Sequence, residues 1–162
     1  MTRTRLVSAA LLLPALLMAP AALAHHDGEP HGSAHVHGTI HGLWLTEEGT
    51  ATVRIADCGP GPMEGTPCGV VETADIPDGE PTTDVNNADP ALRDMPILGL
   101  TMLDGFEADG DGRWKKGRIY NPEDGKSYKS AIRLDGDDPN VLRVKGCIAF
   151  LCQTQEWSRV TD

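Results

Sequence analysis

Short segments in which apolar and polar residues alternate recur along the chain from about residue 40 onward. Residues 52–56, 128–134 and 142–145 show the alternation most clearly, and a period of two is typical of strands with one buried face. Turn sequences rich in Gly, Asn and Asp separate these segments and supply the positive φ angles that hairpins need. The pattern predicts eight strands, near residues 40–47, 50–57, 68–75, 97–104, 112–120, 126–134, 140–147 and 152–160.

One long segment, residues 76–96, interrupts this pattern and is rich in Pro, Asp and Asn. Within it, Asp89 can cap a helix that starts at Pro90, because an aspartate accepts from free backbone N–H groups and proline needs no partner at the first helical position. We expect one or two helical turns around residues 91–94. Loops of this length often carry function or cover another part of the domain.

Eight antiparallel strands joined in sequence predict an all-β fold. We expect a small up-and-down barrel with one short helix in its long loop, because closure removes the exposed edges of the sheet. Gly42 and Trp44 open the first strand, and Arg159 lies near the end of the last. This arrangement resembles the G-x-W motif and late arginine of lipocalins. The resemblance implies that Arg159 covers the Trp44 indole at the closed end of the barrel, in a cation–π contact.

Few aromatic residues are available to such a barrel. The large side chains that could fill its interior or line a small apolar pocket are Trp44, Trp114, Tyr120, Tyr128 and Trp157. Filling is the simpler expectation for so few aromatic rings. Lys116 and Arg118 flank Gly117, and we interpret their face as solvated outer wall; turned inward, it would recognise anions.

The first 24 residues have the pattern of a secretory signal peptide. Two arginines precede an apolar run over residues 6–23, and small residues lead to a cleavage point after Ala24. A membrane anchor is the alternative, but Pro14 and Pro20 interrupt the run, which only just reaches spanning length. We therefore expect a periplasmic or secreted protein.

Cleavage after Ala24 would leave 138 of the 162 residues, enough for one domain with a core. We divide them into a mobile histidine-rich tail, residues 25–39, and a barrel domain, residues 40–162. The chain has a net charge of −10, and losing the two arginines of the signal makes it −12. Such a surface repels phosphate groups, so we expect a monomer that binds no nucleic acid and does not insert in a membrane after cleavage.

All four cysteines lie in the part expected to be exported: Cys58, Cys68, Cys147 and Cys152. An even count in an oxidising compartment predicts two disulfides, and four cysteines allow three pairings. The local pairs, Cys58 with Cys68 and Cys147 with Cys152, would each staple the neck of a hairpin. The alternative is a zinc site on the four thiolates, which the spacings and the exported setting disfavour.

Four segments carry a family resemblance: residues 42–49, 89–96, 117–128 and 145–147. They resemble the successive motifs of an exported bacterial family known as domain of unknown function 2147. That family has no established activity. The resemblance implies a signal peptide and a compact β domain, and it supplies no catalytic residue. The histidine-rich segment before residue 40 lies outside it.

Catalysis is the least expected function. All six histidines lie between residues 25 and 41, the thiols are expected to be oxidised, and no G-x-S-x-G sequence occurs. Residues 107–112 resemble the start of a calcium loop, but Arg118 stands where such a loop needs a bidentate glutamate, so we interpret them as a turn. We expect a protein that binds an unknown small ligand or an envelope protein, with a metal-binding protein as the alternative.

The metal alternative rests on the histidine-rich tail. Its candidate ligands are His25, His26, His31, His35, His37 and His41. Neutral imidazoles suit Zn, Cu or Ni, and the new α-amine beside His26 would add a nitrogen. The alternative for the tail is a histidine-biased linker with incidental metal affinity.

The tail hypothesis predicts that the mature protein starting at His25 binds Zn, Cu or Ni, and that a truncation starting at Gly38 does not. Binding should weaken as the pH falls to about 5, because the imidazoles become protonated near a pKa of about 6.5. Calorimetric titration of both proteins at neutral pH checks this. Equal binding by both would move any metal site into the barrel domain.

Overall fold

The computed structural model describes residues 38–161, and about half of these residues lie in β-strands. The elements are β1 (Gly42–Leu45), β2 (Ala51–Asp57), β3 (Pro67–Ala74), the 3-10 helix η1 (Pro90–Leu92), β4 (Thr101–Asp104), β5 (Glu107–Ala108), β6 (Arg113–Asn121), β7 (Lys126–Leu134), β8 (Val141–Ile148) and β9 (Leu151–Val160). All eight expected strands are present, and β5 is an addition. The largest boundary shift is at β4, which starts at Thr101 and not near residue 97. Within the described range, no helix is long and apolar enough to cross a membrane.

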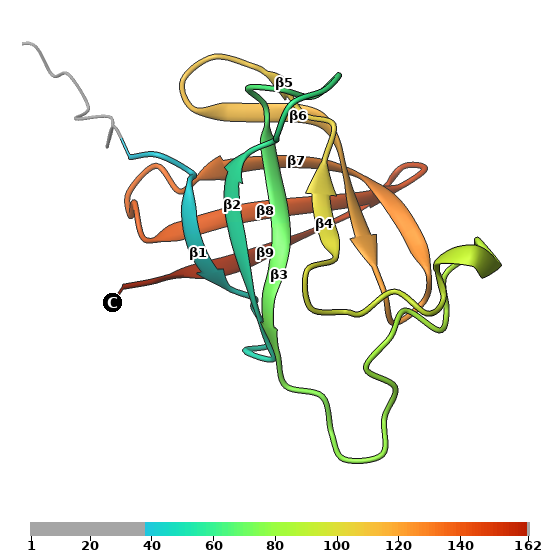
Figure 1. Cartoon of the computed structure of the whole chain (residues 1–162). Coiled ribbons are helices and arrows are strands. Elements are labelled where there is room, and N and C mark those ends of the chain that lie inside the picture. The colour runs from blue at the N-terminus through green and yellow to red at the C-terminus, as the bar shows by residue number, and fades with distance from the viewer. Residues whose placement is uncertain (1–37, 162) are drawn as a thin grey trace, which may run out of the picture. The chain divides into compact units, whose positions relative to one another are not determined.

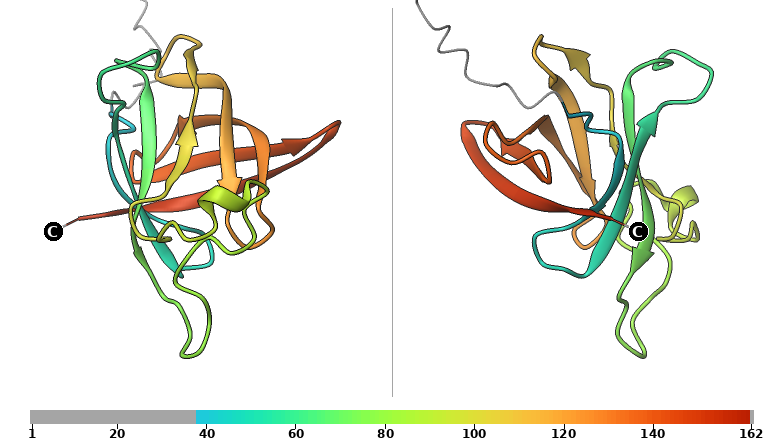
Figure 2. Two further views of the ribbon diagram at one scale, coloured as in Figure 1. Left: turned by 45° about the vertical axis from the view of Figure 1, so that its right-hand side comes forward. Right: turned by 90° about the vertical axis from the view of Figure 1, so that its left-hand side faces the viewer.

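The strands form a closed antiparallel barrel, as predicted (Figures 1 and 2). Their order is β4-β3-β2-β1-β9-β8-β7-β6-β5, and an additional pairing of β4 with β6 joins the two ends of the sheet. This closing seam consists of Leu103 opposite Ile119 and Asp104 opposite Arg118. The short β5 pairs with the start of β6. Eight strands therefore make the wall, and β5 lies at its rim.

A bulge in β6 decides which of its side chains face inward. Trp114 pairs with Ile132 and Gly117 pairs with Ser130, so two residues of β6 oppose one residue of β7. Lys116, in the bulge, has a φ of 58°. Because the spacing from Trp114 to Gly117 is odd, the alternation changes phase there. Beyond the bulge the odd-numbered residues face the interior and the even-numbered residues face outward.

Large side chains fill the interior. The buried cluster contains Ile40, Trp44, Val53, Ile55, Leu103, Phe106, Ile132, Leu142, Val144 and Trp157. Trp44 and Trp157 have no exposed surface, and Phe106 is 2% exposed. A methyl group on Gly117 would lie 2.2 Å from the Phe106 ring, so this glycine makes room for the ring. The expectation that aromatic residues fill the barrel holds for these two tryptophans.

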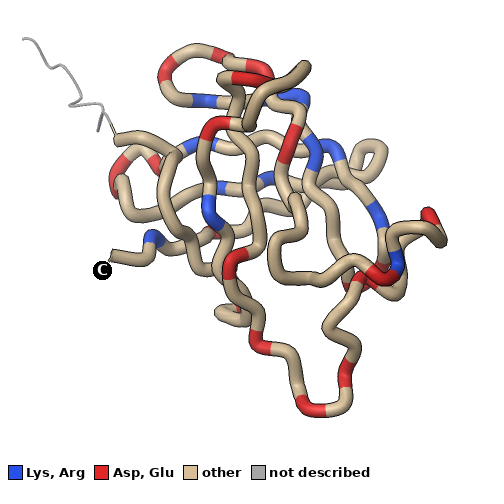
Figure 3. Tube along the Cα trace, in the orientation of Figure 1, with Lys and Arg blue, Asp and Glu red and all other residues tan. Residues whose placement is uncertain are grey.

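Charges divide between strands and connections. Every Lys and Arg of the described residues except Arg93 lies in a strand, whereas most Asp and Glu residues lie in turns and loops (Figure 3). Strands β6, β7 and β8 contain no acidic residue. The net acidity of the chain is therefore a property of its loops, and one part of the wall is cationic.

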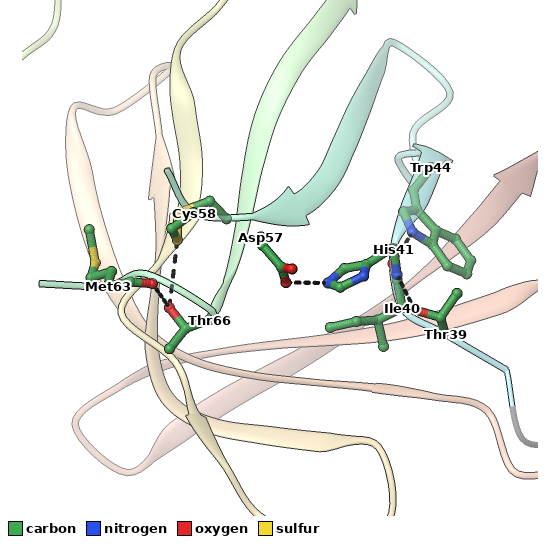
Figure 4. Close-up of polar contacts among 9 residues, drawn as sticks. Thr39, Ile40, His41, Trp44, Asp57, Cys58, Met63 and Thr66 are labelled. Carbon is green, nitrogen blue, oxygen red and sulfur yellow. Dashed lines mark hydrogen bonds and ion pairs between the residues drawn. A yellow bond between two sulfur atoms is a disulfide. The ribbon is translucent and has the colours of Figure 1, made fainter. Parts of the chain in front are cut away.

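Arg159 and Trp44 close one end of the barrel. The Arg159 guanidinium lies 4.1 Å from the centre of the indole ring. It also donates hydrogen bonds to the backbone carbonyls of His41, at 2.9 Å, and Thr39, at 2.6 Å. Trp44 Nε1 donates to the Ile40 carbonyl at 2.8 Å (Figure 4). This is the contact implied by the lipocalin resemblance, and it ties the segment before β1 to the last strand.

Both disulfides join local pairs. Cys58 bonds to Cys68, closing the loop between β2 and β3, and Cys147 bonds to Cys152 at the β8–β9 turn. Thr66 donates to the Met63 carbonyl at 2.7 Å inside the first loop (Figure 4). No cysteine among residues 38–161 is free, so the zinc alternative is wrong. Two disulfides indicate an oxidising environment.

The closed end predicts a graded loss of stability. Trp44→Ala should lower the free energy of unfolding by roughly 3–5 kcal/mol, because it empties a fully buried site. Arg159→Ala should cost roughly 2 kcal/mol, since it removes charged hydrogen bonds to backbone carbonyls. Urea unfolding with the disulfides intact measures both. Arg133→Ala, on the exposed wall, is the matched control and should change stability by less than about 0.5 kcal/mol. A Trp44→Ala variant as stable as this control would contradict the packing described.

Candidate functional site

Residues 82–97 form a covering loop on the outside of the barrel. The loop turns back on itself: Thr83 bridges to Pro96, Asp84 N donates to the Met95 carbonyl at 2.9 Å, and Ile97 N donates to the Thr82 carbonyl at 3.0 Å. A loop whose ends meet and whose backbone is hydrogen-bonded within itself is a compact structural unit. The long interruption in the strand pattern is therefore an ordered element.

The short helix in this loop is held as the sequence predicted. Asp89 Oδ1 accepts from Ala91 N at 2.9 Å, and Pro90 is the first helical residue. Asn87 supports the cap, because its Oδ1 accepts from Asp89 N at 2.9 Å and its carbonyl accepts from Arg93 Nε at 2.8 Å. These bonds fix η1 within the covering loop.

A buried carboxylate anchors the loop. Asp84 is 1% exposed, and the Tyr120 hydroxyl lies 2.8 Å from both of its oxygens. Asn87 Nδ2 donates to Asp84 Oδ2 at 2.6 Å. Burial, with the Asp84 carboxylate as a further cause, raises the pKa of Tyr120 to about 12. A neutral phenol thus donates to the carboxylate, and it ties the loop to β6.

Tyr120 does not lie where the sequence predicted. We expected it among the large side chains inside the barrel, but it projects from the outer face of β6. The bulge before Gly117 shifts the alternation, so that Gly117 and Ile119 face the interior and Tyr120 faces the covering loop. The expectation that Arg118 belongs to the outer wall is confirmed for the same reason. Asp84 carried no signal in the sequence that marked it as an anchor.

The turn between β6 and β7 completes the contact with the loop. Asn86 Nδ2 donates to the carbonyls of Pro122, at 3.2 Å, and Glu123, at 3.0 Å. Gly125 has a φ of 67°, and a side-chain carbon there would lie 1.9 Å from the Asn86 carbonyl oxygen. Only glycine meets both demands, because it has no side chain and tolerates positive φ. The covering loop therefore contacts one of the segments that carry the family resemblance, residues 117–128.

A hollow of about 410 Å³ lies between the covering loop and the outer wall. Leu92 and Met102 give it apolar surface, and Asp89, Asp104, Arg118 and Tyr120 give it polar groups. Arg118 donates to both carboxylate oxygens of Asp104 at 2.9 Å. This ion pair joins the strands of the closing seam and also presents a charged surface to the hollow. Its mixture of apolar walls and convergent polar groups is typical of small-molecule sites.

A second hollow, of about 540 Å³, lies on the outer face of β2 and β3 beside the Cys58–Cys68 disulfide. Its walls include Val70, and its charged groups Arg54 and Glu72 form an ion pair with each other. The Arg54 hydrogen bond lowers the pKa of Glu72. The residues that line this hollow, all within the described part of the chain, include no buried polar cluster like the one around Asp84, so we place the candidate site in the first hollow.

The described residues do not assemble the predicted metal ligands. His41 Nε2 lies 3.1 Å from Asp57 Oδ1 at the closed end (Figure 4), and no group of three His, Cys, Asp or Glu side chains within residues 38–161 is arranged to hold a metal ion. The remaining tail histidines, His25, His26, His31, His35 and His37, lie outside the described residues, as does the signal sequence. Residues 109–112 form the expected turn. Lys115, in β6, pairs with Asp109 and lowers the pKa of the Asp109 carboxyl.

Comparison with known proteins agrees with this fold. The model of a bacterial protein family, described as "Uncharacterized protein conserved in bacteria (DUF2147)", matches residues 42–159. A solved structure, "Protein HP1028 from the human pathogen Helicobacter pylori belongs to the lipocalin family", is similar with a TM-score of 0.64 and 21% sequence identity, over 77% of this chain and 85% of that one. No curated protein sequence matches.

The buried phenol predicts an unusual alkaline titration. In a Tyr128→Phe variant, Tyr120 is the one remaining tyrosine, and its absorbance at the tyrosinate band should rise with a midpoint near pH 12, against about 10 for a free tyrosine. Because the folded pKa exceeds the unfolded one, the stabilisation is complete below about pH 10 and is lost as the pH rises toward 12. Asp84→Asn should lower the midpoint. A midpoint near 10 while circular dichroism still shows folded protein would contradict the buried contact.

Proposed function

The chain belongs to the DUF2147 family of bacterial proteins, and from its own geometry we propose that it is a non-catalytic, lipocalin-like protein that binds a small amphipathic ligand. The proposed site is the hollow between the covering loop, residues 82–97, and the outer wall at β4 and β6. The observation that carries the proposal is the buried Asp84–Tyr120 contact. It fixes the loop over the wall, so the hollow has a defined shape before any ligand arrives.

The filled interior supports a site on the outside. Trp44, Trp157 and Phe106 occupy the volume that a ligand would need within the barrel, each with 2% exposure or less. The outer hollow, at about 410 Å³, falls within the range of roughly 300–1,000 Å³ that is typical of small-molecule sites. The fold thus provides a rigid wall, and the loop provides the recognition surface.

The lining of the hollow indicates the ligand's chemistry. Leu92 and Met102 suit an apolar body, and the Arg118–Asp104 pair suits a polar group that can both donate and accept hydrogen bonds. A free anion would have to compete with Asp104 for the arginine. A ligand with an uncharged or zwitterionic polar end therefore fits better than a simple anion.

Binding is favoured over catalysis by the groups in the lining. The lining residues include no histidine or cysteine. Tyr120, with a pKa of about 12, keeps its proton at neutral pH and donates a hydrogen bond to the Asp84 carboxylate. The Tyr120 phenol is therefore not a base for a bound molecule near pH 7.

The place of action that we propose is the periplasm or the medium outside the cell. The N-terminal sequence has the features of a signal peptide cleaved after Ala24, and two disulfides fit an oxidising compartment. These two observations are independent, because one concerns targeting and the other concerns the folded domain.

The proposal predicts where a ligand perturbs the protein. Adding a small-molecule extract of the periplasmic fraction to labelled protein should shift amide NMR signals of residues 87–92, 101–104 and 118–127. A Leu92→Ser, Arg118→Gln double variant should weaken binding about tenfold, by loss of apolar contact and one charged hydrogen bond. Val70→Ser, in the second hollow, is the matched control and should bind normally. Shifts confined to β2 and β3, or to buried residues such as Leu142 and Val144, would contradict the proposed site.

A further inference from the structure

The turn between β8 and β9 presents apolar side chains to solvent. Phe150 is 89% exposed, Leu151 64% and Ile148 56%. With Ala149 they make a run of four residues without a polar side chain, which we call the apolar tip. Single exposed apolar residues are ordinary, but a contiguous group on a projecting turn marks an interaction site. The hairpin carries the tip past the neighbouring strand ends (Figure 2, left).

The apolar tip is held rigidly. The Cys147–Cys152 disulfide lies immediately behind it, and the pairing of β8 with β9 continues to Ile148 opposite Leu151. Ala149 has a φ of 51°, a conformation that residues other than glycine rarely adopt. Because the hairpin ladder and the disulfide both reach the tip, its side chains need little further ordering to bind a partner.

Two lysines lie behind the tip on the outer wall. Lys129 stands opposite Cys147, and Lys145 stands opposite Ala131, so the two are diagonal neighbours on one face. Both are exposed, and neither has an ion-pair partner among the described residues. Strands β6 to β8 contain no acidic residue, and Glu156 of the neighbouring β9 forms an ion pair with Arg143. At about 3.3 Å of rise per residue, Lys145 lies about 10 Å behind Ile148 along β8.

We propose that the apolar tip docks the protein on the surface of an anionic lipid membrane. Phe150, Leu151 and Ile148 enter the boundary between headgroups and acyl chains, and Lys129 and Lys145 then lie at the depth of the phosphates. Side chains that insert at this boundary reach about 5–10 Å, which is comparable to the distance from Ile148 back to Lys145; Lys129, opposite Cys147, lies nearer the tip. The backbone behind the turn is paired in the hairpin, so few unsatisfied N–H and C=O groups enter the apolar layer.

Lipid suits the tip better than a protein partner. A protein interface ordinarily includes about one hydrogen bond per 100–200 Å² and a polar rim. The four side chains of the tip are apolar and offer no hydrogen bond, and the nearest charged groups behind it, Lys129 and Lys145, are both cationic, which suits a layer of lipid phosphates. The net charge of the whole chain disfavours anionic surfaces, but the acidic residues responsible lie mostly in other loops (Figure 3). At a Debye length of about 8 Å, the local lysines dominate at the tip.

Flotation of the purified, processed protein with lipid vesicles tests the proposal. The protein should bind vesicles of phosphatidylethanolamine and phosphatidylglycerol and bind vesicles of phosphatidylcholine more weakly. A Phe150→Ser, Leu151→Ser double variant should lose at least about tenfold in binding, through loss of apolar burial. Lys129→Glu should lose at least about fivefold, and about 0.5 M NaCl should abolish the difference between the two lipids.

Matched variants separate the tip from other causes. Leu98→Ser removes an apolar residue that is 55% exposed in the loop before β4, and Arg113→Glu reverses a charge on the same sheet away from the tip. Both should bind vesicles like the unaltered protein. Any lipid affinity of the N-terminal residues is common to all variants and cancels.

Three results would overturn the proposal. The first is no binding to either vesicle, and the second is equal binding by the double variant at unchanged thermal stability. The third is self-association, seen by sedimentation velocity, that the double variant loses without any lipid effect; this would make a second copy of the chain the partner of the tip. None of these outcomes bears on ligand binding in the hollow at the covering loop, so the two proposals fail independently.

Discussion

The barrel closes through a seam of only two residue pairs between β4 and β6, and the rest of the structure depends on it. Inside, Leu103 and Ile119 contribute apolar surface to the core, and outside, Arg118 and Asp104 form a bidentate ion pair. The ion pair is exposed, so its own contribution to stability is small. The seam is stable because the core on one side and the covering loop on the other both protect it.

The covering loop packs beside this seam and adds a buried polar cluster to it. Within residues 38–161, no Lys or Arg side chain forms an ion pair with the buried Asp84 carboxylate. It therefore relies on the Tyr120 hydroxyl and the Asn87 amide for its side-chain hydrogen bonds. Removing one donor would leave the buried carboxylate with a single side-chain partner, and removing both would leave it with none, which is costly. The hydrogen bonds to Asp84 thus hold the loop in place. The loop in this position forms one wall of the hollow lined by Leu92 and Arg118. The proposed binding site and the closure of the barrel therefore share Asp104 and Arg118.

The two ends of the domain are built differently. At the closed end, Arg159 covers Trp44 and bonds to the carbonyls that precede β1, which seals the core from water. At the other end the β8–β9 hairpin extends outward with its disulfide and exposes Phe150. The proposed ligand site and the proposed membrane contact therefore lie on separate parts of one small domain.

The sequence by itself determined the eight strands, the cap of η1, the local disulfide pairs and the contact of Arg159 with Trp44. Alternation, turn residues and caps act over a few residues, and the last contact came from a family resemblance. Only the tertiary structure decided that Tyr120 faces outward, because a bulge changes the phase of the alternation and no local pattern marks it. It alone also showed that Asp84 is an anchor, since its partner lies 36 residues away. A carboxylate in a polar loop has the same sequence signature whether it is solvated or buried, and burial depends on contacts between distant segments.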